Sequence, residues 1–161
     1  MKPKDKVALI AGKVMADAKL AGELIEILKT GTDVEKGTCA DVLKHVSKEK
    51  PEALAPFIGV IISYIDYKAP RVKWGVPECI GNMAQKFPKE TEKAIPKLLE
   101  NAKDESTVVR LCAAFALTQI ARNNPRAGGK LAKVFAETVK KEKNNGVRNV
   151  YLKALKEFEK A

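Results

Sequence analysis

Residues 88–121 read PKETEKAIPKLLENAKDESTVVRLCAAFALTQIA. The stretch opens on Pro88, and a similar pattern opens on Pro51, 37 residues earlier, and on Pro125, 37 residues later. Recurrence at this period is typical of stacked helical units, none of which buries its apolar face alone. The sequence therefore predicts an array of helical pairs and not a compact bundle.

The first helix of each pair, helix A, carries the same apolar face four times. Stepping by 37 residues, this face comprises Leu20, Ala21, Leu24, Ile25 and Leu28; Phe57, Ile58, Ile61, Ile62 and Ile65; Ala94, Ile95, Leu98, Leu99 and Ala102; and Leu131, Ala132, Phe135, Ala136 and Val139. The spacing i, i+1, i+4, i+5, i+8 is one side of an α-helix. All twenty positions are apolar although 45% of the chain is, so chance alignment does not explain the register.

The second helix, helix B, repeats as well. Its face comprises Cys39, Val42, Leu43 and Val46; Val76, Cys79, Ile80 and Met83; Ala113, Ala116, Leu117 and Ile120; and, after a step of 38, Tyr151, Ala154, Leu155 and Phe158. Ahead of residue 17, an amphipathic helix is predicted to cap the first repeat, because the end of a solenoid otherwise exposes apolar surface.

The third copy resembles the HEAT repeat. It has a proline in helix A (Pro96), an aspartate in the turn (Asp104), and Val109-Arg110 opening a B helix rich in small residues. The resemblance implies an all-α fold, a right-handed superhelix (α-solenoid) of about four two-helix repeats with an N-terminal capping helix, forming one domain over residues 1–161. An armadillo array is the nearest rival, but we expect no third short helix between B and A.

Composition favours a soluble cytoplasmic protein. The three cysteines form no C-x-x-C pair and no zinc spacing, which argues against a disulfide framework. The longest apolar run, Phe57–Ile65, is far shorter than the ~20 residues of a membrane span. A net charge of +10 favours acidic partners.

No constellation of residues predicts catalysis. The only histidine, His45, has no second imidazole for a metal site, and Gly128-Gly129-Lys130 lacks the rest of a phosphate-binding loop. The cysteines fall on the apolar B face, where they behave as small hydrophobes. We expect no enzyme activity, no metal and no cofactor.

The resemblance implies that the B helices line the concave side of the array. We predict that the stripe opposite their apolar face is exposed there: Lys36, Ala40, Lys44 and Lys48; Lys73, Pro77, Gly81 and Gln85; Arg110, Ala114, Thr118 and Arg122; and Arg148, Leu152, Lys156 and Lys160. Nine of these sixteen are basic and none is acidic, so the stripe predicts a groove that attracts anions.

Two features qualify this groove. Lys36, Lys73, Arg110 and Arg148 occupy the place of the family arginine that pairs with turn aspartates, and Asp104 with Arg110 is the best such pair. Trp74, the only tryptophan, either packs between repeats or anchors a ligand. The candidate partner-binding residues are Lys36, Lys44, Lys48, Lys73, Trp74, Arg110, Arg122, Arg148 and Lys156.

Three functions remain open. The first is a non-catalytic scaffold that presents the basic groove to an acidic protein segment. The second is nucleic-acid binding through phosphate contacts along the same groove. The third follows from the resemblance, since some HEAT-like proteins are DNA glycosylases or lyases, although these glycosylases need an aromatic-lined cleft. No membrane partner or small-molecule substrate is expected.

Overall fold

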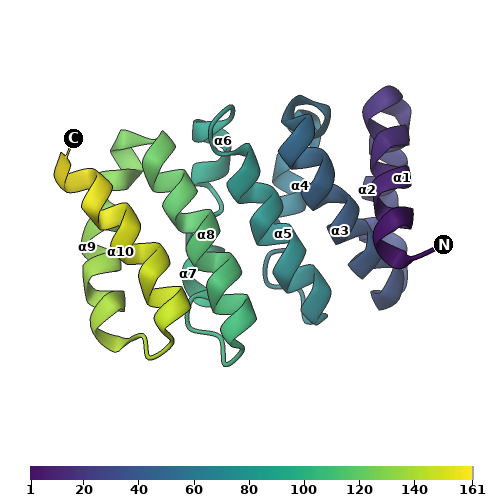
Figure 1. The fold of residues 1–161 in the computed structure, drawn as a ribbon. Coiled ribbons are helices and arrows are strands. Elements are labelled where there is room, and N and C mark those ends of the chain that lie inside the picture. Colours follow the sequence, from purple (N-terminus) through teal and green to yellow (C-terminus); the bar gives the residue numbers. More distant parts are fainter. Residues whose placement is uncertain (161) are drawn as a thin grey trace.

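The computed structural model describes residues 1–160, which form helices joined by short turns. The elements are α1 (Pro3–Ala16), α2 (Ala18–Thr30), α3 (Asp33–Glu49), the 3-10 helix η1 (Pro51–Phe57), α4 (Ile58–Ile62), α5 (Pro70–Met83), α6 (Pro88–Glu92), α7 (Ile95–Asn101), α8 (Thr107–Asn123), α9 (Pro125–Lys141) and α10 (Asn145–Lys160). Helices α3, α5, α8 and α10 follow one another in one layer, with α2, α4, α7 and α9 in a second layer behind them (Figure 1). This arrangement confirms the predicted α-solenoid.

Polar side chains fix where several helices begin. Thr32 and Glu35 form a capping box at the start of α3, in which each side chain accepts a hydrogen bond from the other residue's backbone N–H, at 3.2 and 2.8 Å. Asn124 caps α9 by accepting from the backbone N–H of Ala127, and its amide donates to the Pro88 carbonyl of the preceding repeat at 3.1 Å. Caps of this kind satisfy backbone groups that a helix end leaves open.

The three repeat-opening prolines, Pro51, Pro88 and Pro125, are each the first residue of a helix, as their spacing predicts. This position suits proline because the first N–H groups of a helix need no intrahelical acceptor.

Our prediction of one continuous A helix in every repeat is wrong for the second and third repeats. There the A segment is split, into η1 and α4 and into α6 and α7. Pro56 lies inside η1, and Pro96 lies in the first turn of α7, where it begins a new helix. Because proline supplies no backbone N–H and clashes with the preceding turn, these residues divide the A segment. Each of the two repeats therefore has three helical pieces, and our expectation of no third short helix between B and A is wrong there.

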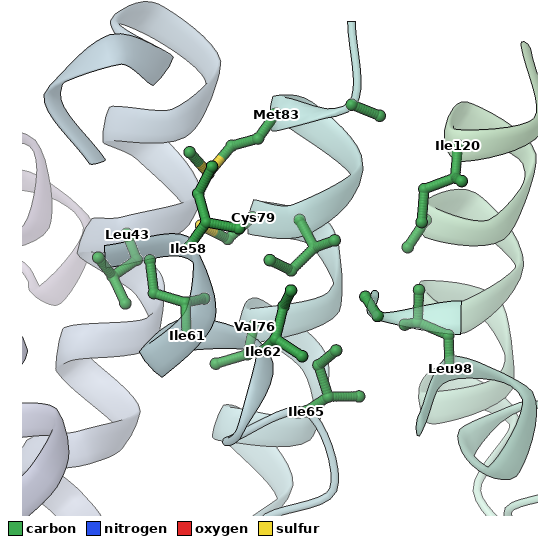
Figure 2. Packing of buried hydrophobic residues seen from close by; sticks show 14 of the residues in the cluster. Leu43, Ile58, Ile61, Ile62, Ile65, Val76, Cys79, Met83, Leu98 and Ile120 are labelled. Carbon is green, nitrogen blue, oxygen red and sulfur yellow. The ribbon is translucent and has the colours of Figure 1, made fainter. Parts of the chain in front are cut away.

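The predicted apolar faces form the core. Leu98, Val76 and Ile120 have no exposed surface, and Figure 2 shows Ile61 and Ile62 from the A layer beside Val76 from the B layer. At the N-terminal end, α1 buries Ala11 and Val14 and packs against α2 and α3. This confirms the predicted cap on the first repeat.

Neighbouring B helices approach closely through small residues. A Cβ atom placed on Gly75 of α5 would lie 3.0 Å from both the Cβ and the carbonyl oxygen of Ala40 on α3. One placed on Gly81 would lie 2.7 Å from the Phe115 ring on α8. The absence of side chains at these two positions therefore allows the B helices to pack, and this packing decides which B-helix side remains open.

Candidate protein-binding groove

The B layer is hollowed by a groove of about 1270 Å³ that crosses four helices. Its lining comes from Lys4 and Lys6 of α1; Asp41, Lys44, His45, Lys48 and Glu49 of α3; Arg71, Glu78 and Asn82 of α5; and Phe115 and Gln119 of α8, among others. A hollow on this layer agrees with the expectation that the B helices line the concave side.

The predicted inward stripe is only partly open: Lys44 and Lys48 line the groove, but other members of the stripe are buried. Ala40, Pro77, Gly81, Ala114 and Thr118 are buried, because this side of each B helix packs against the next B helix. The groove instead uses the residues one position further along, such as Asp41, Glu78 and Phe115, and the row His45, Asn82 and Gln119. The apolar register was right, but the exposed face is rotated by one residue.

Lys36 lies inside the fold and does not face the groove. Only 6% of the residue is exposed, and its Nζ donates to the Leu28 carbonyl at 2.6 Å. The same ammonium lies 5.3 Å from the centre of the Tyr64 ring and 5.4 Å from that of Tyr67, so both rings attract the charge. We therefore correct the expectation that Lys36 is available to a partner.

Three further predicted cations bind turns between helices. Lys73 Nζ donates to Asp104 at 2.9 Å, and this bond is the main reason that the pKa of Asp104 is lowered. Arg110 pairs with Glu142 at 3.1 Å and donates to the Asp104 carbonyl, so the predicted pairing of its guanidinium with the Asp104 carboxylate is wrong. Arg148 donates to the Glu142 carbonyl at 2.8 Å. These residues fasten each turn to a neighbouring helix.

The remaining predicted cations differ in whether they form an ion pair. Arg122 pairs with Glu157 of α10, which lowers the pKa of that carboxyl, and Lys44 lies 3.4 Å from Glu78 of α5. Lys48 and Lys156 are exposed and form no ion pair within residues 1–160. Of the nine candidates, Lys44 and Lys48 line the groove itself.

Trp74 does not pack into the core, because 38% of the residue is exposed on α5. Its counterpart 37 residues later is Leu111 on α8, which is 41% exposed, and Val108 one turn earlier is 46% exposed. Sequence reasoning missed these two neighbours. They could have been found from the sequence, because both lie outside the repeating apolar faces. A large hydrophobic side chain at such a position is not needed to fill the core.

Positive charge is concentrated at the C-terminal end of the array. Residues 125–160, which form α9 and α10 and the turn between them, contain ten Lys and Arg against four Glu, a net charge of +6 out of the chain's +10. Lys153 of α10 occupies the place that Glu78 and Phe115 hold on their helices, and its side chain is exposed. On α10 itself, four cations stand against two carboxylates, a net charge of +2.

The three thiols are not available at the surface. Cys39, Cys79 and Cys112 are buried, and burial raises the pKa of each thiol to about 12. Over residues 1–160 no cluster of three or more metal-ligating side chains occurs. Within the same span no helix combines the length and the apolar character needed to cross a bilayer.

Comparison with known proteins agrees with this architecture. The HEAT repeat family matches residues 94–123. A designed armadillo repeat protein in complex with the peptide (KR)4 superposes with a TM-score of 0.73 at 18% identity, covering 92% of this chain and 73% of that one. No curated protein sequence matches the chain.

Two further solved structures share the fold. Computationally designed armadillo repeat proteins for modular peptide recognition give a TM-score of 0.71 at 19% identity, with 95% of this chain and 74% of that chain covered. An engineered protein gives 0.72 at 16% identity, with 96% and 72% covered. The chain thus has the α-solenoid fold of HEAT and armadillo repeats.

Proposed function

We propose that the chain is a non-catalytic scaffold that binds an acidic segment of a protein partner in its concave groove. The observation that carries this proposal is the groove itself, which opens across α1, α3, α5 and α8 and is lined by more cations than carboxylates. Such a surface is long enough to hold an extended segment, and its field favours negative charge.

The charge balance of the groove supports an acidic occupant. Its cations are Lys4, Lys6, Lys44, Lys48 and Arg71, against the carboxylates Asp41, Glu49 and Glu78. Two of the three carboxylates are already neutralised, Asp41 by Arg71 at 2.6 Å and Glu78 by Lys44 at 3.4 Å. Lys4, Lys6 and Lys48 are left exposed along the rim.

The structural neighbours support a peptide-like partner in general terms. Two of them are designed armadillo proteins, one for modular peptide recognition and one in complex with (KR)4, a basic peptide. The groove of the present chain carries net positive charge, so we propose the opposite sign of peptide for it.

The test is fluorescence anisotropy with a labelled oligoglutamate peptide, an oligolysine peptide of equal length and a DNA duplex. We expect the oligoglutamate to bind, and Lys44→Glu combined with Lys48→Glu to weaken binding about tenfold, since each exposed pair contributes up to about 1 kcal/mol. The matched control is Lys89→Glu with Lys93→Glu, which changes net charge equally but on exposed residues at the α6 end of the other layer.

Three results would contradict the proposal. An equal loss in the control variant would show that only overall charge matters. Failure of the oligoglutamate to bind would remove the acidic partner. Preferential binding of the duplex, with log K falling by about 0.9 per phosphate contact against log salt, would establish the nucleic-acid interpretation instead.

A further inference from the structure

Large apolar side chains gather on the B layer beside the groove. Trp74, Val108 and Leu111 are 38, 46 and 41% exposed, and Phe115, which lines the groove, lies one helical turn beyond Leu111. Trp74 and Leu111 hold equivalent places on α5 and α8, two helices that pack side by side (Figure 1). We call these four residues the apolar shelf.

Three of the four shelf residues, Trp74, Val108 and Leu111, lie outside the buried core. Phe115 is half-buried, and its ring packs over Gly81 of α5 at the inner edge of the shelf. Neighbouring exposed apolar residues are uncommon on a soluble surface unless they meet a ligand. An aromatic and a leucine at adjacent places on two rigid helices provide a preformed contact for a single apolar side chain.

Charges surround the shelf on both sides along the array. On α5, Trp74 lies one turn from Arg71 and one turn from Glu78, which pair with Asp41 and Lys44 of α3. Lys48 follows on α3, while Lys153, which holds the place of Phe115, is exposed on α10 at the opposite side. The cations therefore flank an apolar centre.

We propose that the partner segment places one bulky apolar side chain, such as Phe or Leu, on the apolar shelf and carries acidic residues on both sides of it. This rests on the function proposed above and specifies its ligand. Charge complementarity selects this occupant over a second copy of the chain, because each copy carries a net charge of +10.

The helix spacing sets the distance between the apolar residue and the acids. Packed helices lie about 8–10 Å apart, and an extended chain advances about 3.3 Å per residue. The centre of the shelf lies between α5 and α8, so α3 and α10 are each about one and a half helix spacings away. The acidic residues should therefore begin about four positions before and after the apolar residue.

The probe is the peptide Glu-Glu-Glu-Gly-Ser-Ser-Phe-Ser-Ser-Gly-Glu-Glu-Glu, compared with the same peptide in which Ser replaces Phe. We expect the Phe peptide to bind about tenfold more tightly, because burial of an aromatic side chain is favourable even after its ordering is subtracted. Trp74 is the only tryptophan, so its emission should shift to shorter wavelength with the Phe peptide and change little with the Ser peptide.

Leu111→Ser should abolish the tenfold advantage of the Phe peptide and leave the affinity for the Ser peptide unchanged. The matched control is Val134→Ser, which alters a 37% exposed residue on α9 in the other layer. Circular dichroism and thermal melting test whether both variants fold. If Leu111→Ser does not fold, the variants Trp74→Phe and Val108→Ser are measured in its place by the same anisotropy assay.

The outcomes separate the two proposals. If both peptides bind equally, the shelf proposal fails and the acidic groove stands. If neither binds, both fail. If the Phe advantage survives Leu111→Ser, or is lost equally in Val134→Ser, the apolar contact lies elsewhere and the shelf is rejected.

Discussion

Arg110 of α8 and Glu142 in the turn after α9 form an ion pair in which the guanidinium Nε and Nη2 both donate to the carboxylate, at 3.1 to 3.3 Å. The Glu142 side chain is only 6% exposed. The Nη1 group of the same arginine donates to the carbonyls of Asp104 and Glu105 at 3.0 Å. One side chain therefore joins the turn of its own repeat to the turn of the next.

Loss of this carboxylate should destabilise the fold. We expect Glu142→Ala to lower the free energy of unfolding by about 2–3 kcal/mol, because it leaves a partly buried guanidinium without its charged acceptor. Urea denaturation followed by circular dichroism measures the change. Glu137→Ala is the matched control, since Glu137 pairs with Lys140 on the exposed surface of α9, and we expect a change below about 0.5 kcal/mol. Similar losses in both variants would contradict the assignment.

The apolar faces were predictable because burial imposes the helical period on every copy. Each expected B-face residue from Cys39 to Ile120 is buried, and Leu98 on the A face has no exposed surface. The side of the B helices that is exposed to solvent was harder to predict from the sequence. Both flanks of the apolar face tolerate small residues, and only the close approach of Gly75 to Ala40 reveals which flank packs against the next helix.

The pairing of charges was also beyond the sequence. Lys73 of the second repeat binds Asp104 of the third, so the bond joins successive repeats. A repeat of 37 residues shows which positions are equivalent. It does not show how close a side chain of one repeat lies to the turn of the next repeat. The one pair that we predicted, Asp104 with Arg110, is therefore wrong in its acidic partner, because the Arg110 guanidinium pairs with Glu142.

Acid should weaken the contact between Lys73 and Asp104. The folded protein lowers the pKa of Asp104, chiefly through the hydrogen bond from Lys73, so this group stabilises the fold above its unfolded pKa and the contribution is lost as pH falls through the folded pKa. We expect unfolding free energies measured between about pH 6 and pH 2 to fall less steeply for Asp104→Asn than for the unmodified chain. Parallel pH profiles would show that this carboxylate contributes nothing.

The buried thiols should resist alkylation while the chain is folded. With a pKa of about 12, Cys79 is about 0.01% thiolate at pH 8, whereas an ordinary thiol with a pKa of 9.0 is about 10% thiolate. Iodoacetamide at pH 8, followed by mass spectrometry, should therefore modify the cysteines only at the rate of unfolding and should modify all three in urea. Rapid labelling of the native chain at Cys79 would contradict the described packing.

Two adjacent glycines of α9 should respond in opposite directions to the same substitution. A Cβ atom on Gly128 would lie 2.8 Å from the Ala121 carbonyl oxygen of α8, whereas one on Gly129 would meet no atom within 4 Å. We expect Gly128→Ala to destabilise by about 1–3 kcal/mol, because the backbone must move to admit the methyl group. Gly129→Ala should stabilise by about 0.5–1 kcal/mol, since alanine loses less conformational entropy in a helix. Thermal and urea melts measure the free energy of unfolding of both variants, which carry the same substitution at adjacent positions of one helix. Stability changes of the same sign would show that α9 does not approach α8 as described.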